Sequence, residues 1–89
     1  MRKPRLHVTY DEGRAEVAYL RLARKPGDKA VESERVEPEM VLDFNKEGKL
    51  IGIEIVDPEH VTLEAINKIL HKYGFPALSK KDLAPLLAA

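Results

Sequence analysis

Cysteine and tryptophan are absent from this chain of 89 residues, and it has no apolar run long enough to cross a membrane. Without cysteine there is no disulfide, no thiolate nucleophile and no cysteine zinc site. Stability must therefore come from packing, ion pairs or a second chain. The N-terminal stretch also lacks the apolar segment of a signal peptide, so we expect a cytoplasmic protein.

Net charge of one sign is missing too, since 15 Lys and Arg residues balance 15 Asp and Glu residues. Neutrality argues against the broad positive field that nucleic-acid binding usually requires. The charges are unevenly spread, however, with an acidic middle over 30–65 between two basic ends. The remaining candidates for nucleic-acid contact are Arg2, Lys3, Arg5, Lys80 and Lys81.

The first part of the chain has the pattern of a β-hairpin. Leu6, Val8 and Tyr10 occupy alternate positions, and residues 11–14 supply a turn that contains a glycine. A second strand over about 15–23 carries apolar side chains on both of its faces. Both faces of this hairpin therefore need cover.

The segment 30–44 predicts a third strand in two halves. Its charged half, 31–37, is expected at a sheet edge with a bend at Pro38, which cannot donate to a ladder. Its apolar half, 40–44, is expected to form a hairpin with a strand over 49–56, across a loop that Gly48 closes. The expected register pairs Phe44 with Lys49, Leu42 with Ile51 and Met40 with Ile53.

A helix is predicted over 63–73, because Thr62 is a good N-cap, apolar residues follow at helical spacing and Gly74 suits the C-terminus. We expect this helix to cover Ile51, Ile53 and Ile55. The predicted fold class is α+β in a single domain over 1–89. It is an antiparallel β-meander of about four strands with a C-terminal helix packed on one face and a short terminal helix.

The expected sheet leaves its second face without a helix. Apolar side chains on that face would be exposed to solvent in a monomer. A homodimer is the commonest symmetric assembly that would bury them. The predicted interaction surface consists of Val17, Tyr19, Arg21, Val41, Asp43, Leu50 and Glu54.

Two stretches resemble a known family pattern: 10–22 reads YDEGRAEVAYLRL and 41–55 reads VLDFNKEGKLIGIEI. Over roughly residues 8–57 the chain resembles the small prokaryotic proteins grouped as Domain of Unknown Function 2283. Gly52–Ile55 is the most specific part, Asn45 stands where the family often has Asp, and the helical extension over about 60–89 lies outside the pattern. The family has no established activity. Its association with genes for small toxin-like proteins implies an antitoxin-like role.

A carboxylate cluster is the main candidate for chemistry. Asp43 and Glu54 lie on neighbouring expected strands and Asp11 lies near a turn, so together they would form a cation or acid–base site. The expected register separates Asp43 from Glu54 by two pairs, and a useful general acid needs burial in a cleft. In the alternative interpretation, Asp43 accepts N–H bonds from the loop 45–48 and Glu54 pairs with Arg21.

No metal or cofactor motif accompanies these carboxylates. The loop 43–48 lacks the ligands of a calcium loop, and the expected N-cap Thr62 separates His60 from Glu64. His7 and His71 have no fixed spacing to them, and no phosphate-binding glycine motif is present. We therefore expect no cofactor and no metal.

The leading expectation is a non-enzymatic protein-binding module that acts as a homodimer and, by resemblance, is antitoxin-like. Two alternatives stay open. One is a cation-dependent enzyme that uses Asp11, Asp43 and Glu54, and the other is a weak nucleic-acid-binding protein.

Overall fold

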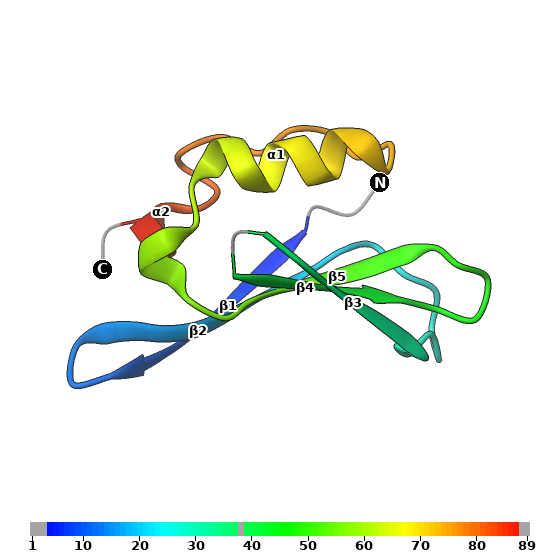
Figure 1. Ribbon diagram of the computed structural model, residues 1–89, viewed down its shortest axis with the longest axis horizontal. Coiled ribbons are helices and arrows are strands. Elements are labelled where there is room, and N and C mark those ends of the chain that lie inside the picture. The colour runs from blue at the N-terminus through cyan, green and yellow to red at the C-terminus, as the bar shows by residue number, and fades with distance from the viewer. Residues whose placement is uncertain (1–3, 38, 88–89) are drawn as a thin grey trace.

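The computed structural model describes residues 4–37 and 39–87. Three helical elements follow the strands (Figure 1). They are the 3-10 turn η1 (Pro58–His60), the helix α1 (Leu63–Lys72) and the short helix α2 (Ala84–Leu87). The α+β class is confirmed, but the sheet has five strands instead of about four. The strands are β1 (Arg5–Asp11), β2 (Arg14–Arg21), β3 (Glu32–Val36), β4 (Met40–Phe44) and β5 (Leu50–Ile55).

The strand order is β1-β2-β5-β4-β3, with every neighbouring pair antiparallel. The last strand, β5, thus lies at the centre of the sheet, where Ile53 pairs with Leu20 of β2 and with Leu42 of β4. The expectation of a simple meander was wrong in this respect. A β1–β2 hairpin and a β3–β4–β5 meander are joined side by side, because β5 is the most apolar strand and is covered best at the centre.

The first hairpin forms as predicted. Glu12 and Gly13 between β1 and β2 have φ values of 51° and 80°. Positive φ at both central residues defines the type I′ turn, which matches the twist of the strands it joins.

The charged segment before residue 38 is a separate strand. Val36 of β3 pairs with Met40 of β4, so the chain reverses there, whereas we expected a bend within one strand. Glu39 in this turn has a φ of 45°. Pro38, the expected position of the bend, lies outside the described residues. The prediction of an edge strand is confirmed, because β3 is last in the sheet order.

The β4–β5 register differs from the expected one by two residues at Met40 and Leu42 and by one residue at Phe44. Leu42 pairs with Ile53, Met40 with Ile55 and Phe44 with Leu50. An irregularity between Asp43 and Phe44 leaves Ile51 as an extra residue in β5. A shift of two keeps Met40 and Leu42 on the same face, because side chains alternate with a period of two. The bulge nevertheless places Leu50, and not Ile51, on the face that the helix covers.

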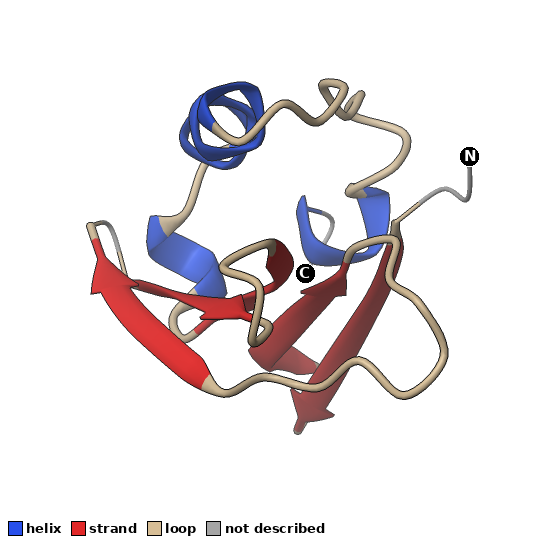
Figure 2. Cartoon of the chain, turned by 90° about the vertical axis from the view of Figure 1, so that its right-hand side faces the viewer, coloured by secondary structure: helices blue, strands red, loops and turns tan. Residues whose placement is uncertain are grey.

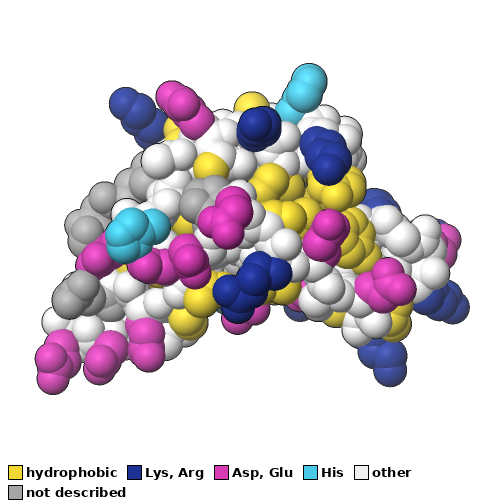
Figure 3. Space-filling view, in the orientation of Figure 1, with side chains coloured by type: hydrophobic (Ala, Val, Ile, Leu, Met, Phe, Trp, Pro, Cys, Tyr) yellow, Lys and Arg dark blue, Asp and Glu magenta, His cyan; other side chains and the backbone are white. Residues whose placement is uncertain are grey.

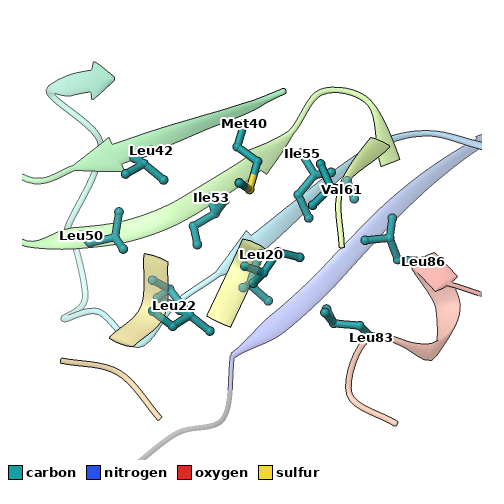
Figure 4. Packing of buried hydrophobic residues seen from close by; sticks show 13 residues of the cluster. Leu20, Leu22, Met40, Leu42, Leu50, Ile53, Ile55, Val61, Leu83 and Leu86 are labelled. Carbon is teal, nitrogen blue, oxygen red and sulfur yellow. The ribbon is translucent and has the colours of Figure 1, made fainter. Parts of the chain in front are cut away.

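The core lies between the sheet and the helices (Figure 4). Ile53 and Ile55 belong to it as predicted, and each is 0% exposed. Ile51 is also fully buried but lies outside this cluster, so it does not face the helix as expected. Leu50 takes its place in the core. Each such side chain contributes about 1.5–3 kcal/mol through burial.

Helix α1 covers one face of the sheet (Figure 2). Thr62 caps it, since its hydroxyl accepts a hydrogen bond from the Ala65 amide at 3.1 Å. Ile66 and Leu70 are the buried residues of this helix. Gly74 follows its C-terminus with a φ of 82°. None of the helices among the described residues is long and apolar enough to span a membrane.

Candidate functional site

The sheet face opposite α1 carries most of the predicted interaction surface. We call it the open face. The β2 residues Val17 and Tyr19 and the β4 residues Val41 and Asp43 are half-buried on it, while Arg21 and Glu54 are exposed. The structure therefore brings together these six residues of the predicted seven: Val17, Tyr19, Arg21, Val41, Asp43 and Glu54.

Leu50 does not belong to the open face, and that part of the prediction was wrong. Its side chain is 2% exposed within the core cluster. The cause is the bulge at Ile51, which adds one residue to β5 and reverses the facing of every residue before it.

Tyr19 lies across Gly52. The phenol of Tyr19 sits directly above the Cα of Gly52, so that a Cβ built on Gly52 would overlap the phenol oxygen and the ring. In the ladder Tyr19 is paired with Glu54 and Arg21 with Gly52, which makes Tyr19 and Gly52 diagonal neighbours. The φ of Gly52 is not positive, so its backbone does not require glycine. Glycine is required here because any side chain would overlap Tyr19.

Hydrogen bonds fix the phenol at this position. The Tyr19 hydroxyl donates to Asp43 Oδ2 at 3.1 Å and accepts from Arg24 Nη2 at 3.1 Å. Arg24 Nη2 also donates to the Ile51 carbonyl, which the bulge presents. Ser33 Oγ of β3 donates to Asp43 Oδ1 at 2.8 Å. We call Tyr19, Arg24, Ser33 and Asp43 the Tyr19–Asp43 cluster.

The cluster holds its tyrosine in the neutral form. Burial raises the pKa of the Tyr19 hydroxyl above its ordinary value of 10.0. The hydrogen bond from Arg24 opposes this shift, and the Asp43 carboxylate supports it. In this form, Tyr19 serves the cluster as both a hydrogen-bond donor and a hydrogen-bond acceptor.

A second polar contact holds the connection 22–31 in place, and with it Arg24. Asn45, which is 4% exposed, accepts hydrogen bonds from the amides of Glu47 and Lys49 at 3.0 and 2.9 Å. Its amide donates to Asp28 Oδ2 at 3.4 Å, which ties the connection to the β4–β5 hairpin. The loop bonds that we assigned to Asp43 are thus made by Asn45. This frees Asp43 for the open face.

The proposed carboxylate site is not assembled. Asp43 and Glu54 are diagonal neighbours on the open face, because Asp43 pairs with Gly52 and Val41 with Glu54. Asp11 lies at the end of β1, on the far side of β2 from both. Within the described residues, no three His, Cys, Asp or Glu side chains are placed to hold a metal ion.

The histidines are separate as well. His60 Nδ1 lies 2.6 Å from Asp57 Oδ2 at the start of η1. This hydrogen bond is the main cause that raises the pKa of His60, and the negative charge of Asp57 is the second. His7 belongs to β1 and His71 to the end of α1. Of the basic residues considered for nucleic-acid contact, Arg5, Lys80 and Lys81 are exposed, and Arg2 and Lys3 lie outside the described residues.

Two hollows were not anticipated, because each is built from segments far apart in the sequence. A groove of about 630 Å³ runs between α1 and the β3–β4 side of the sheet, where Figure 3 shows hydrophobic side chains gathered. An acidic hollow of about 550 Å³ lies beside the end of β1. Its charged lining residues are Asp11, Glu16, Glu39, Asp57 and Glu59.

Comparison with known protein families gives a match, whereas comparison with individual proteins does not. No curated protein and no solved structure matches the chain. The family described as "Protein of unknown function (DUF2283)" matches residues 7–57, which is more than half of the chain and includes all five strands except the first two residues of β1. The chain therefore belongs to the DUF2283 family.

Proposed function

We propose that the protein is a non-enzymatic, homodimeric module that binds a second protein through its open face, in an antitoxin-like role. The observation that carries this proposal is the Tyr19–Asp43 cluster, in which hydrogen bonds hold Tyr19 and Arg24 on the face opposite α1. Tyr and Arg are enriched at binding hot spots. Side chains that are already held in one geometry lose less entropy on binding.

The surroundings of the cluster suit a protein partner. Val17 and Val41 are half-buried and offer apolar contact beside it. Arg21 and Glu54, which are exposed and of opposite charge, would orient a partner that carries the complementary pair. Interfaces are enriched in aromatic residues and Arg, have apolar contacts at their core and carry charged residues at their rim.

The same geometry favours binding over catalysis. Both oxygens of Asp43 accept hydrogen bonds, from Tyr19 and from Ser33. A carboxylate that joins β2, β3 and β4 in this way positions its neighbours, which is a structural role. Calorimetric titration with Mg²⁺, Ca²⁺ and Mn²⁺ is expected to give no heat of binding. Heat that disappears in Asp43→Asn would favour the cation-dependent enzyme instead.

The proposal is tested by copurification of the tagged chain from its native cytosol. We expect a stoichiometric protein companion, and we expect the single variants Glu54→Lys and Val41→Gln to lose it. Lys68→Glu on α1 is the matched control, because it reverses an exposed charge on the other side of the sheet. A chain that elutes without any companion, or a companion that Glu54→Lys and Val41→Gln retain, contradicts the proposed binding face.

A further inference from the structure

We propose that β1, at one edge of the sheet, pairs antiparallel with β1 of a second copy of this chain, with Val8 opposite Val8 at the two-fold axis. Two five-stranded sheets would thereby become continuous. The inference rests on the proposed function insofar as it specifies the homodimer contact. It uses residues other than those proposed to bind the second protein.

The edge of β1 is open. β1 is first in the sheet order and pairs with β2 alone. Among residues 4–37 and 39–87, no backbone hydrogen bond joins β1 to any segment other than β2. Tyr10 on this strand is 50% exposed, and among the residues whose burial is described, Val31 is the other large hydrophobic residue exposed to this extent. The Tyr10 hydroxyl donates to the Pro85 carbonyl, but its ring stays half exposed beside an edge that has no backbone partner in this part of the chain, and such an edge is a template for another strand.

The backbone of this edge is in phase with the proposed register. A two-residue hairpin closes on a hydrogen-bonded pair, here Asp11 and Arg14, and such pairs alternate with non-bonded pairs along a ladder. The ladder has an irregularity between Thr9 and Tyr10, but the extra residue, Glu16, belongs to β2, so β1 itself keeps its alternation. Counting back along β1, Leu6, Val8 and Tyr10 direct their peptide groups away from β2. An axis at Val8 places these outward groups of two copies opposite each other.

The side chains are complementary in the same register. Opposite charges and apolar pairs that lie directly across an antiparallel ladder stabilise it, and the two-fold axis forms each pair twice. The cross-copy pairs are Arg5 with Asp11, Leu6 with Tyr10 and His7 with Thr9.

The second copy also relieves an unfavourable feature of the single chain. Arg5 of β1 is directly opposite Arg21 of β2, and like charges in this position destabilise a ladder. The acidic hollow, which Asp11 helps to line, lies at the other end of β1. The proposed pairing places Asp11 of each copy beside Arg5 of the other. Each end of the strand thus receives the charge that it lacks.

The other edge of the sheet does not offer this fit. Antiparallel pairing of β3 with a second β3 places Glu34 opposite Glu34 when it is centred there. A two-fold axis at Arg35 places the Arg35 residues of the two copies opposite each other. An axis at Ser33 places Glu32 of one copy opposite Glu34 of the other. Such charge on an edge strand is a known defence against pairing. Of the two edge strands, β1 is therefore the one that we expect to pair with a second copy.

Cysteine cross-linking tests the register, because the chain has no cysteine of its own. Directly opposed residues in an antiparallel ladder have Cα atoms about 4.5–5.5 Å apart, within the range that a disulfide spans. We expect a mixture of His7→Cys and Thr9→Cys proteins to form a disulfide-linked dimer under mild oxidation. Each variant alone should remain unlinked. Absence of the mixed product, or equal linking of either variant alone, would overturn the register.

Charge exchange tests the contact itself. In sedimentation equilibrium we expect Arg5→Glu and Asp11→Arg each to weaken the dimer about tenfold or more, since each places like charges opposite twice. An equimolar mixture of the two should restore dimerisation, because every pair across the axis is then complementary. Arg35→Glu on β3 is the control and should change nothing.

The outcomes separate this inference from the proposed function. A chain that is monomeric at all concentrations overturns the β1 contact, as does a dimer that both Arg5→Glu and Asp11→Arg leave intact. In either case, the partner-binding face is still tested separately, by copurification of the companion with Glu54→Lys and Val41→Gln. Conversely, a dimer that behaves as expected while no protein companion copurifies supports the β1 contact and contradicts the open-face proposal.

Discussion

The two faces of the sheet are built from alternate residues of the same strands, yet different forces hold them. On the side of α1, Leu20, Leu42 and Ile53 are at most 2% exposed, and apolar burial stabilises them. On the open face, Tyr19 and Asp43 are half-buried and joined by directional hydrogen bonds. The covered face therefore supplies most of the stability, and the open face supplies a fixed arrangement of polar groups.

Gly52 links the two faces. It lies next to Ile53 in the central strand, and its bare Cα is the surface on which Tyr19 rests. A position without a side chain in the middle of a sheet normally weakens a strand. Here the ring of a neighbouring strand fills the space, so the sheet keeps its packing and the phenol gains its position.

The largest expected effect is on the covered face. Ile53→Ala should lower the free energy of unfolding by about 2–5 kcal/mol, because it leaves a cavity at a position without solvent contact. Urea denaturation measures this. The adjacent and exposed Glu54→Ala should change stability by no more than about 0.5 kcal/mol. Similar losses in both variants would contradict the division between the faces.

The next effect concerns the contact between Tyr19 and Gly52. Gly52→Ala should destabilise the protein by about 1–3 kcal/mol, because the new methyl group overlaps the phenol. In a Tyr19→Ala background the same change should become neutral or stabilising by up to about 1 kcal/mol, since its φ suits alanine. A double-mutant cycle with no coupling would show that Tyr19 does not lie over Gly52.

A smaller effect is expected for the hydrogen bonds of the open face. Tyr19→Phe keeps the ring but removes the donor to Asp43, and it should cost about 1 kcal/mol. Tyr10→Phe is the control, because its hydroxyl donates to the Pro85 carbonyl at an exposed site. Thermal unfolding of both variants should show the larger loss for Tyr19→Phe. Equal losses would mean that the Tyr19–Asp43 cluster contributes no more than a surface contact.

The smallest effect lies outside both faces, at His60. Asp57 raises the pKa of this fully exposed histidine. Its contribution to stability is therefore complete below the unfolded pKa of about 6.5 and is lost as the pH rises through the higher folded value. An NMR titration of His60 should show the raised pKa, and Asp57→Asn should bring it back toward its ordinary value. An unchanged titration in Asp57→Asn would assign the shift to another cause.

Much of the fold follows from local patterns. Alternating residues located β1 and β2, the pair Glu12 and Gly13 formed the turn between them, and the Thr62 cap marked the start of α1. Six of the seven residues predicted for the open face lie there, because a period of two assigns a face without any knowledge of the neighbouring strand.

Other features depend on contacts between distant segments. The bulge at Ile51 moved Leu50 into the core, and no local pattern marks a single unpaired residue. The role of Arg24 was also missed. It lies in a connection that is held by Asp28 and Asn45, and it reaches Tyr19 only when the β4–β5 hairpin stands beside β2. Its place in a polar connection between β2 and β3 offered no signal of this contact.

The sequence by itself determined the hairpin turn, the boundaries of α1 to within one residue, the face of most strand residues and the family. These features depend on backbone preferences and on periodicity within a few residues. Only the tertiary structure decided the strand order, the bulge and the union of Tyr19, Arg24 and Asp43. Strand pairing is chosen by the total apolar surface that the whole chain buries, which is a property of all the segments together.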